Sequence, residues 1–292
     1  MTTEPCWRFE AIGTVWEIET DEPLDDDLRR AVASLIGTFD AEWSRFRVDS
    51  VISRIAEGGR AAAPVDTVAM LDLYSALSTA TRGAVQPLVG GALAARGYDA
   101  ASSLRDIGAA PAPAHWHDTL TWDAETLALE RPAIIDVGAV GKGRLVDRVA
   151  DLVASRVARV IVDAGGDLAV RGRTERIGLE HPFDSTRAIG TWQVTDAALC
   201  ASATNRRAWG DGLHHVLDAR TGEPVRAIAA TWAVASTAML ADAVATALFF
   251  EGGARFAFEQ GVEWVRMSTG GRVEWSPGCG AELFTAGTTV EE

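Results

Sequence analysis

The segment that most constrains the fold is a glycine-rich stretch at residues 133–147, AIIDVGAVGKGRLVD. Its apolar start, residues 133–135, predicts a buried strand, and the glycines after it let the backbone come close to a ligand. Apolar residues then recur at helical spacing from Leu145 onward. Free N–H groups and the positive end of a helix dipole are therefore expected beside Lys142, an arrangement that suits a phosphate.

The turn alone does not settle its role. Its spacing is neither G-x-G-x-x-G nor the P-loop pattern G-x-x-x-x-G-K-[ST]. A plain connection between a strand and a helix explains the glycines equally well, so other segments must decide between the two interpretations.

Charge and composition exclude some classes of protein. The 292 residues carry a formal net charge of −14, which argues against nucleic acid as the main partner. A polyanionic ligand would need local help from a metal or a helix N-terminus. The chain is 48% hydrophobic and 23% charged, which predicts a globular unit with a substantial core.

Neither cysteine chemistry nor a membrane is indicated. Cys6, Cys200 and Cys279 are far apart, with no C-x-x-C, so we expect neither a disulfide framework nor a cysteine metal site. The start of the chain has no basic region followed by an apolar core, and no run is long enough to span a bilayer. A cytoplasmic protein is the simplest expectation.

The first part of the chain predicts a strand and two helices. Residues 7–18 end in the alternation of a half-buried strand, with Gly13 as a bulge. Acidic residues 25–27 precede a helical pattern and are interpreted as helix capping, not as a metal site. A second amphipathic helix is expected at residues 65–77, followed by a loop at residues 83–91.

Aromatic and histidine residues in this part have open interpretations. Phe46 stands in a polar and aromatic stretch, where it could stack on a planar ring or belong to the core. His115 and His117 lie in an expected loop and are interpreted as solvent-facing, although an H-x-H pair can also bind metal.

Further polar clusters follow the central helix. An apolar strand at residues 158–170 is broken by Gly165-Gly166-Asp167, which marks either a turn or a backbone pressed against a ligand. Hydroxyls, cations and imidazoles gather at residues 202–207 and 214–224, and residues 218–224 predict a polar turn.

The last chemical element is an alanine-rich helix predicted at residues 237–248. Asp242 and Thr246 are four residues apart and share one face of that helix, where a carboxylate and a hydroxyl could bind Mg²⁺. A polar stripe without a metal is the alternative. The tail, residues 262–275, predicts a β-hairpin.

Six short motifs, taken together in chain order, resemble the bacterial FAD:protein FMN transferase (ApbE-like) family. The resemblance covers nearly the whole chain, and its most specific parts are the central D-x-G-x-x-x-K-G turn and the closing A-D-x-x-x-T-A-L helix. The motifs are residues 9–14, 43–46 with Ser50, 136–143 with Asp147, 165–167, 215–218 with residues 221–222, and 241–242 with residues 246–248.

The resemblance implies a flavin site with a metal. Phe46 matches the position of a ring that flanks the isoalloxazine, and His215 matches a histidine considered for proton transfer. Mg²⁺ is implied at the carbonyl of Ala139 and the side chains of Asp242 and Thr246. The positions that match FAD contacts are Ile12, Phe46, Ala84, Val85, Gln86, Asp136, Lys142 and Val216.

The chain also departs from the family pattern. Where the family usually has Phe-Asp-Pro-Thr, residues 85–88 are Val-Gln-Pro-Leu, so a carboxylate and a hydroxyl are missing. Ile12, Ala203 and Ala219 replace a usual methionine, glycine and proline. The metal helix is intact while part of the flavin wall has changed, which supports binding better than turnover.

The expected fold is α+β, a single ApbE-like domain over residues 1–292. It forms one compact two-lobed unit with mixed and antiparallel sheets and a flavin cleft between the lobes. The irregular order of strands and helices and the lack of an internal repeat favour this over a doubly wound sheet.

The implied activity is Mg²⁺-dependent transfer of FMN from FAD to a Thr or Ser hydroxyl of a target protein. A phosphoester bond forms and AMP leaves. Two alternatives stay open: an FAD pyrophosphatase that gives FMN and AMP, and a non-catalytic FAD-binding protein, which the missing carboxylate at Gln86 favours. NAD is not expected, because its fingerprint is missing.

Overall fold

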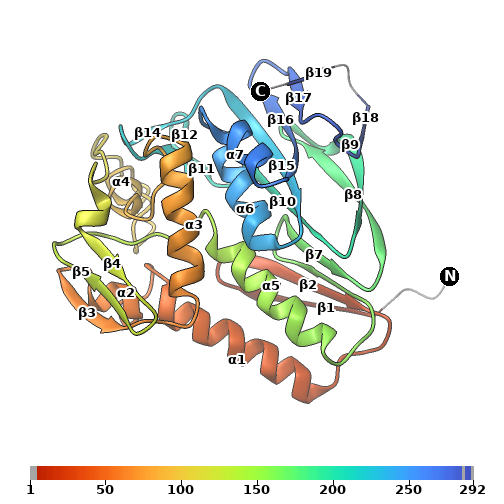
Figure 1. The fold of residues 1–292 in the computed structure, drawn as a ribbon, viewed down its shortest axis with the longest axis horizontal. Coiled ribbons are helices and arrows are strands. Elements are labelled where there is room, and N and C mark those ends of the chain that lie inside the picture. Colours follow the sequence, from red (N-terminus) through yellow and green to blue (C-terminus); the bar gives the residue numbers. More distant parts are fainter. Residues whose placement is uncertain (1–4, 285–286, 291–292) are drawn as a thin grey trace.

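A large, mostly antiparallel sheet crosses the molecule (Figure 1). The computed structural model describes residues 5–284 and 287–290, and within them this sheet has nine strands in the order β1-β2-β6-β7-β10-β15-β16-β17-β19. Among the described strands, β17 and β19 alone pair in parallel. The strands are β1 (Cys6–Ala11), β2 (Thr14–Thr20), β6 (Val160–Asp163), β7 (Asp167–Arg171), β10 (Ala198–Ala203), β15 (Ile228–Ala235), β16 (Glu263–Ser268), β17 (Val273–Trp275) and β19 (Gly287–Thr289).

Helices α5 (Gly141–Ala154) and α6 (Ala238–Ala247) cover one face of this sheet (Figure 1). Val160 and Val162 of β6 point into the core shared with the helices, because alternate residues of a strand face opposite sides. The two helices touch closely at Gly143, where a Cβ atom would lie only 2.3 Å from the carbonyl oxygen of Ala238. Any other residue there would push α5 away from α6.

A second sheet covers the opposite face. Its strands are β8 (Thr174–His181), β9 (Asp184–Thr195) and β18 (Ala281–Leu283). Ile161 of β6 and Val170 of β7 pack there against Leu179 and Trp192 in a separate hydrophobic cluster. The large sheet is thus buried on both faces in its central part, which explains its apolar strands.

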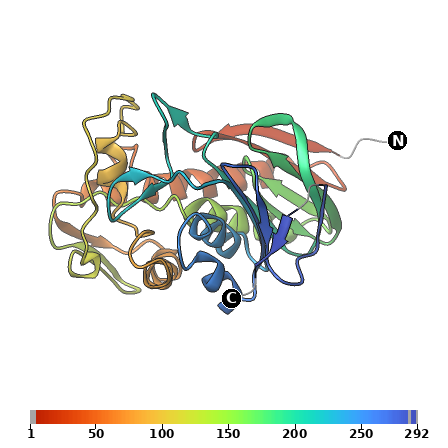
Figure 2. The ribbon, with the colours of Figure 1, turned by 90° about the horizontal axis from the view of Figure 1, so that it is seen from above.

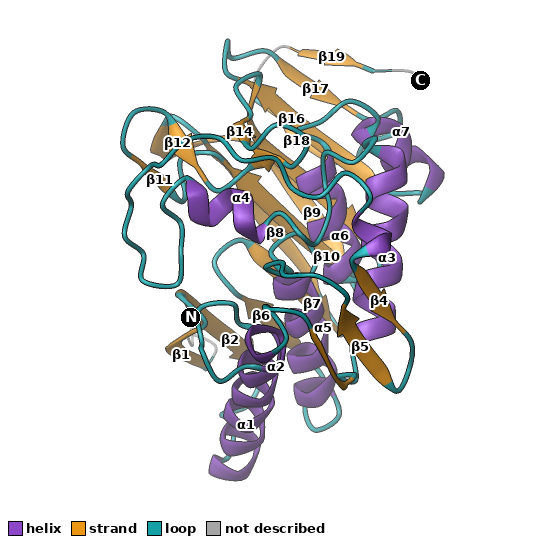
Figure 3. Cartoon of the chain, turned by 90° about the vertical axis from the view of Figure 1, so that its left-hand side faces the viewer, coloured by secondary structure: helices purple, strands orange, loops and turns teal. Residues whose placement is uncertain are grey.

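A third sheet and the helices around α3 form the other lobe (Figure 3), while α1 and α7 also pack against α5 and α6, respectively. The small sheet has the order β3-β5-β4. The elements are α1 (Asp26–Trp43), α2 (Val51–Arg54), β3 (Gly59–Ala62), α3 (Thr67–Ala80), α4 (Gly90–Ala95), the 3₁₀ helix η1 (Trp116–Asp118), β4 (Leu120–Trp122), β5 (Thr126–Leu129) and α7 (Gly253–Glu259).

Two short hairpins complete the described part of the fold. They are β11 (Ala208–Trp209) with β12 (Leu213–His214), and β13 (Leu217–Asp218) with β14 (Glu223–Pro224). The view from above shows the yellow segment around residues 90–115 at the end of the molecule opposite the N-terminus (Figure 2).

The predicted α+β class and its antiparallel and mixed sheets are confirmed. The acidic run is helix capping, as expected, because Asp25 accepts a hydrogen bond from the N–H of Leu28 at 2.7 Å. The alanine-rich helix begins after Thr237, whose hydroxyl oxygen accepts the N–H of Leu240. The hairpin at residues 262–275 is also present.

Three local predictions are wrong. Residues 133–135 belong to no strand. They pack beside other loops, and the N–H of Ala133 donates to the carbonyl oxygen of Ala56. Gly13 is no bulge, because Ile12 and Gly13 form the turn of the β1–β2 hairpin, with φ of 44° and 75°. The loop expected at residues 83–91 ends early, since Gly90 begins α4.

Within the described residues, no helix combines the length and the apolar character needed to cross a membrane. The three cysteines are free.

Candidate functional site

A cavity of about 820 Å³ lies where the two lobes meet, and all of the residues predicted for the site line it. The cavity lies within the size range of ligand sites. It brings together turns and helix ends that are far apart in the sequence. The predicted residues along its wall are Ile12, Phe46, Ala84, Val85, Gln86, Asp136, Ala139, Lys142, His215, Val216, Asp242 and Thr246. Their individual roles stay predictions.

One wall is the turn of the β1–β2 hairpin. Ile12 is a non-glycine residue with positive φ, a conformation that costs free energy for a branched side chain. The turn lies beside the β6–β7 turn, because a Cβ atom at Gly165 would lie 2.2 Å from the hydroxyl of Thr14. Gly165 also lines the cavity, which agrees with the ligand interpretation of the Gly-Gly-Asp motif.

Arg45 holds an aromatic corner of the cavity. Its guanidinium carbon lies 4.2 Å from the ring centroid of Phe46 and 5.0 Å from that of Tyr98. Its Nε donates to Asp136 Oδ2 at 2.5 Å, and its Nη1 donates to the carbonyl of Tyr98. Phe46 is 40% exposed, so it has a free surface for a planar ligand.

Tyr74 of α3 holds the central turn. Its hydroxyl donates to the carbonyl of Asp136 at 3.0 Å and accepts the N–H of Ala139 at 3.1 Å. Burial, together with the charge of Asp136, raises the pKa of Tyr74 well above its ordinary value, so it remains a neutral donor. Asp136 Oδ1 accepts the N–H of Gly138, which tightens the same turn.

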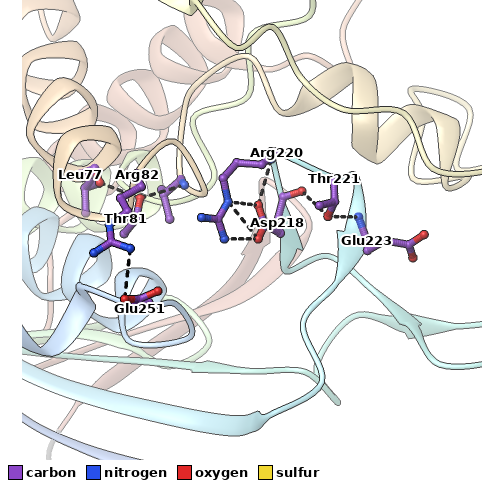
Figure 4. Close-up of polar contacts among 9 residues, drawn as sticks. Leu77, Thr81, Arg82, Asp218, Arg220, Thr221, Glu223 and Glu251 are labelled. Atoms are coloured by element: carbon purple, nitrogen blue, oxygen red, sulfur yellow. Dashed lines mark hydrogen bonds and ion pairs between the residues drawn. The ribbon is translucent and has the colours of Figure 1, made fainter.

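The loop with Ala84, Val85 and Gln86 is held from two sides. Thr81 donates to the carbonyl of Leu77 (Figure 4) and accepts the N–H of Val85 at 3.1 Å. On the other side the carbonyl of Ala84 accepts the N–H of Ala219, at the turn that follows β13.

That turn is itself rigid, because Arg220 binds both carboxylate oxygens of Asp218 and the Thr221 hydroxyl accepts the N–H of Glu223 (Figure 4). This confirms the predicted polar turn at residues 218–224.

Lys142 is the single lysine of the chain and stands in the first turn of α5. Its Nζ lies 3.0 Å from Asp167 Oδ2, whose side chain is 1% exposed. Burial opposes the charge of Lys142, but the carboxylates of Asp167 and Asp242 outweigh it and raise the pKa of the amine. Lys142 therefore carries a positive charge at the wall of the cavity.

Asp242 is buried where α5 meets α6. Its Oδ2 accepts the N–H of Gly143 at 3.0 Å. Burial, and secondly the charge of Asp167, raise the pKa of Asp242 well above its ordinary value. A cation bound at this carboxylate would stabilise the ionised form.

The predicted metal ligands are compatible with Mg²⁺. No group of three or more His, Cys, Asp or Glu side chains suited to a metal occurs in residues 5–284 and 287–290. The predicted set contains only one such side chain, Asp242, beside the hydroxyl of Thr246 and the carbonyl of Ala139. These three oxygen donors line one cavity and are the ligand type that a hard cation prefers.

His215 is neutral in this environment. Burial and the positive charges of Arg207, His214 and Lys142 lower its pKa to about 3. Its Nδ1 is buried and has no hydrogen-bond partner among the described residues. The imidazole thus has a nitrogen available to a bound ligand.

Cationic side chains are prominent in the cavity wall although the chain is acidic. Five cationic side chains line the cavity beside three acidic ones, in a chain of net charge −14. The cationic residues are Arg45, Arg47, Lys142, Arg206 and Arg207, and the acidic residues are Asp40, Asp136 and Asp242. This distribution favours an anionic ligand.

Buried polar atoms without partners also gather here. In the described part of the chain, four cavity residues each have one such atom: Trp43 Nε1, Arg45 Nη2, Gln86 Oε1 and His215 Nδ1. Buried polar groups are normally paired, so these atoms indicate a polar ligand in the cavity.

Sequence reasoning assigned no role to Arg45, Tyr74 or Tyr98. Arg45 and its neighbours were noticed as a polar-aromatic stretch, but its pairing with Asp136 spans 91 residues and left no local signal. Outside the cavity, His115 and His117 are exposed, as expected, and His117 contacts the hydroxyl of Ser75.

Comparisons with known proteins agree with this geometry. The chain is 27% identical over 307 residues to a FAD:protein FMN transferase of Rhodobacter capsulatus, covering 94% of this chain and 57% of that protein. It is 33% identical over 128 residues to a FAD:protein FMN transferase of Klebsiella pneumoniae, covering 42% of this chain and 40% of the relative. The chain thus spans about half the length of these curated relatives.

Solved structures share the fold. The ApbE protein of Thermotoga maritima has a TM-score of 0.79 at 21% identity, covering 94% of this chain and 97% of that one. The flavin transferase ApbE of Vibrio cholerae has a TM-score of 0.77 at 22% identity, covering 91% and 94%. The sequence model of the ApbE family matches residues 12–267. This chain belongs to the ApbE family.

Proposed function

We propose that this protein transfers the FMN part of FAD to a Thr or Ser hydroxyl of a target protein. The hydroxyl oxygen forms a bond to the FMN-side phosphorus of the pyrophosphate, the bond from that phosphorus to the bridging oxygen breaks, and AMP leaves. The product is a phosphoester between FMN and the target protein.

The observation that carries this proposal is the polar character of the cavity wall in an acidic protein. Five cationic side chains line the cavity, and in the described part of the chain four of its lining residues each have a buried polar atom without a hydrogen-bond partner. FAD matches this wall in three ways. Its pyrophosphate supplies negative charge for the cations, its polar atoms supply hydrogen-bond donors and acceptors, and its planar flavin ring suits the aromatic corner formed by Phe46 and Tyr98.

Each residue then has a chemical task. Lys142 neutralises charge on the pyrophosphate oxygens, aided by the N-terminus of α5. His215 accepts the proton of the attacking hydroxyl; the bound anion offsets the nearby cations and raises the basicity of the imidazole from its low starting value. Tyr74 and Arg45 hold the turn that contains Asp136 and Ala139.

Mg²⁺ held by the carbonyl of Ala139 with Asp242 and Thr246 would stabilise negative charge on the phosphoryl oxygens. The carboxylate of Asp242 supports this assignment, because burial disfavours its ionised form and a bound cation would stabilise that form.

A second candidate is FAD binding without turnover. Gln86 stands where the family usually has a carboxylate, and its Nε2 donates to the carbonyl of Pro113 at 3.1 Å. The amide is therefore fixed and offers only its Oε1, which can accept a hydrogen bond from a ligand but carries no charge.

One assay separates the candidates. The protein is incubated with FAD and Mg²⁺, with and without a candidate acceptor protein. Protein-linked FMN identifies the transferase, free FMN with AMP in the absence of acceptor identifies a pyrophosphatase, and intact FAD under all conditions identifies a binding protein.

A further inference from the structure

One cation of the cavity has no carboxylate partner among the described residues. Among the described residues, four of its five cationic side chains form ion pairs: Arg45 with Asp136, Arg47 with Asp40, Lys142 with Asp167, and Arg206 with Glu180. Arg207 has neither an ion pair nor a side-chain hydrogen bond in residues 5–284 and 287–290, and it is exposed. Adjacent arginines of the same wall thus differ in pairing.

The backbone places Arg207 beside the predicted chemistry. The carbonyl of Arg207 accepts the N–H of His215 at 3.3 Å, where the β11–β12 hairpin begins and ends. Trp209 of the same hairpin is buried and donates through Nε1 to the carbonyl of Arg96 at 2.9 Å, so the hairpin is held against the other lobe. Arg207 therefore extends from a fixed strand end.

The charge of Arg207 acts on the groups that are predicted to bind phosphate and to accept the proton. It is among the charges that lower the pKa of His215. It also opposes the positive charge of Lys142. Because like charges repel, an anion bound between Arg207, Lys142 and His215 would be stabilised by them.

We propose that Arg207 contacts the pyrophosphate of bound FAD together with Lys142. This inference rests on the proposed function. Lys142 remains paired with Asp167, so much of its charge is already neutralised within the protein. The guanidinium of Arg207 supplies an uncompensated charge and a planar fork of donors that matches two phosphate oxygens. It would stabilise the charge that develops on the transferring phosphoryl group.

The test compares neighbouring arginines. Arg207→Gln and Arg206→Gln change the net charge equally at adjacent positions, but Arg206 is already paired with Glu180. FAD and riboflavin, which lacks phosphate, are titrated by flavin fluorescence against each variant and the wild type, and thermal melting confirms folding.

We expect Arg207→Gln to weaken FAD binding about 10- to 100-fold and to leave riboflavin binding within about threefold. Arg206→Gln should weaken FAD binding by no more than about threefold. Arg207→Lys, which keeps the charge but not the fork, should recover part of the lost affinity.

Equal FAD affinity in the wild type and Arg207→Gln would overturn the inference, as would equal losses in the two glutamine variants. A parallel loss of riboflavin affinity would also overturn it, because the contact would then lie on the flavin ring. Failure of the wild type to bind FAD would instead contradict the proposed function itself.

Discussion

Asp147 of α5 and Asp242 of α6 each bind backbone N–H groups of the other helix. The carboxylate of Asp147 accepts the N–H of Ala238 at 2.7 Å and of Met239 at 2.9 Å, at the start of α6. In the opposite direction, the carboxylate of Asp242 on α6 accepts the N–H of Gly143 at the start of α5. Each of the two carboxyl groups thus lies at the N-terminal, positive end of a helix dipole.

Asp147→Asn should therefore loosen the junction of the two helices. The amide keeps one acceptor but turns a donor toward a backbone N–H, leaving that buried group without a partner. We expect a loss of about 1–3 kcal/mol in the free energy of unfolding, measured by urea denaturation. Asp151→Asn is the control, because this side chain on the same helix is 71% exposed and should change stability by less than about 0.5 kcal/mol. Equal effects in both variants would show that the reciprocal contact contributes nothing.

Asp242→Asn should separate folding from metal-dependent chemistry. Burial disfavours the ionised carboxylate, and an amide oxygen can still accept the N–H of Gly143, so the variant should be at least as stable as the wild type. Mg²⁺-dependent FAD turnover should be lost, or Mg²⁺-dependent FAD binding if the wild type does not turn over.

Thr246→Val should weaken the Mg²⁺ dependence less, because it removes a neutral ligand. Titration of Mg²⁺ at fixed FAD checks both variants. The same Mg²⁺ dependence in the wild type and Asp242→Asn would refute the proposed ligand set.

His215 should make stability depend on pH. Its pKa is lowered from 6.5 to about 3 in the folded protein, so the unfolded state binds more protons between these values. Its contribution to stability is fully present above pH 6.5 and is lost as pH falls toward 3, at up to about 1.4 kcal/mol per pH unit. His215→Gln should flatten this part of the profile, measured by denaturation from pH 7 to pH 4. His115→Gln, at an exposed position, is the control, and an unchanged slope in His215→Gln would contradict the buried neutral imidazole.

Lys142 can be followed chemically because the chain has no other lysine. An amine-selective acylating reagent can modify only this side chain and the N-terminal amine. Lys142 is 24% exposed and protonated through Asp167 and Asp242, so labelling should be slow, and FAD should slow it at least about tenfold further. Peptide mass spectrometry gives both rates. FAD that leaves the labelling rate of Lys142 unchanged would place the ligand elsewhere.

The helices were predictable because their signals are local. Asp25 as a cap, the apolar periodicity of α5 and the alanine-rich α6 are all encoded within a few residues of the elements they define. The same holds for the hairpin at residues 262–275 and for the polar turn at residues 218–224.

The errors arose where tertiary context decides. The apolar run at residues 133–135 has the composition of a strand, but its backbone hydrogen bonds go to loops, as with Asp136 N–H and the carbonyl of Pro87. The hairpin turn at Gly13 also requires a positive φ at Ile12. A branched residue gives no sequence signal for this conformation, so the turn was not predicted.

Motif order and family resemblance predicted residues that line the cavity. They did not predict which of these residues form ion pairs with one another or with other residues. Arg45 with Asp136, and Lys142 with Asp167, join distant parts of the chain. The sequence therefore indicated which residues gather, but not that Arg207 alone among the cavity cations has no carboxylate partner in the described part of the chain.

The proposed transfer of FMN from FAD to a protein hydroxyl is tested most directly by measuring two products in one reaction with FAD and Mg²⁺. AMP release is measured, and FMN attached to an acceptor protein is quantified by mass spectrometry. The proposal predicts one AMP for each FMN attached, and loss of both products when the acceptor's Thr or Ser is replaced by alanine. AMP released at the same rate without acceptor, or FAD left intact in its presence, would contradict it.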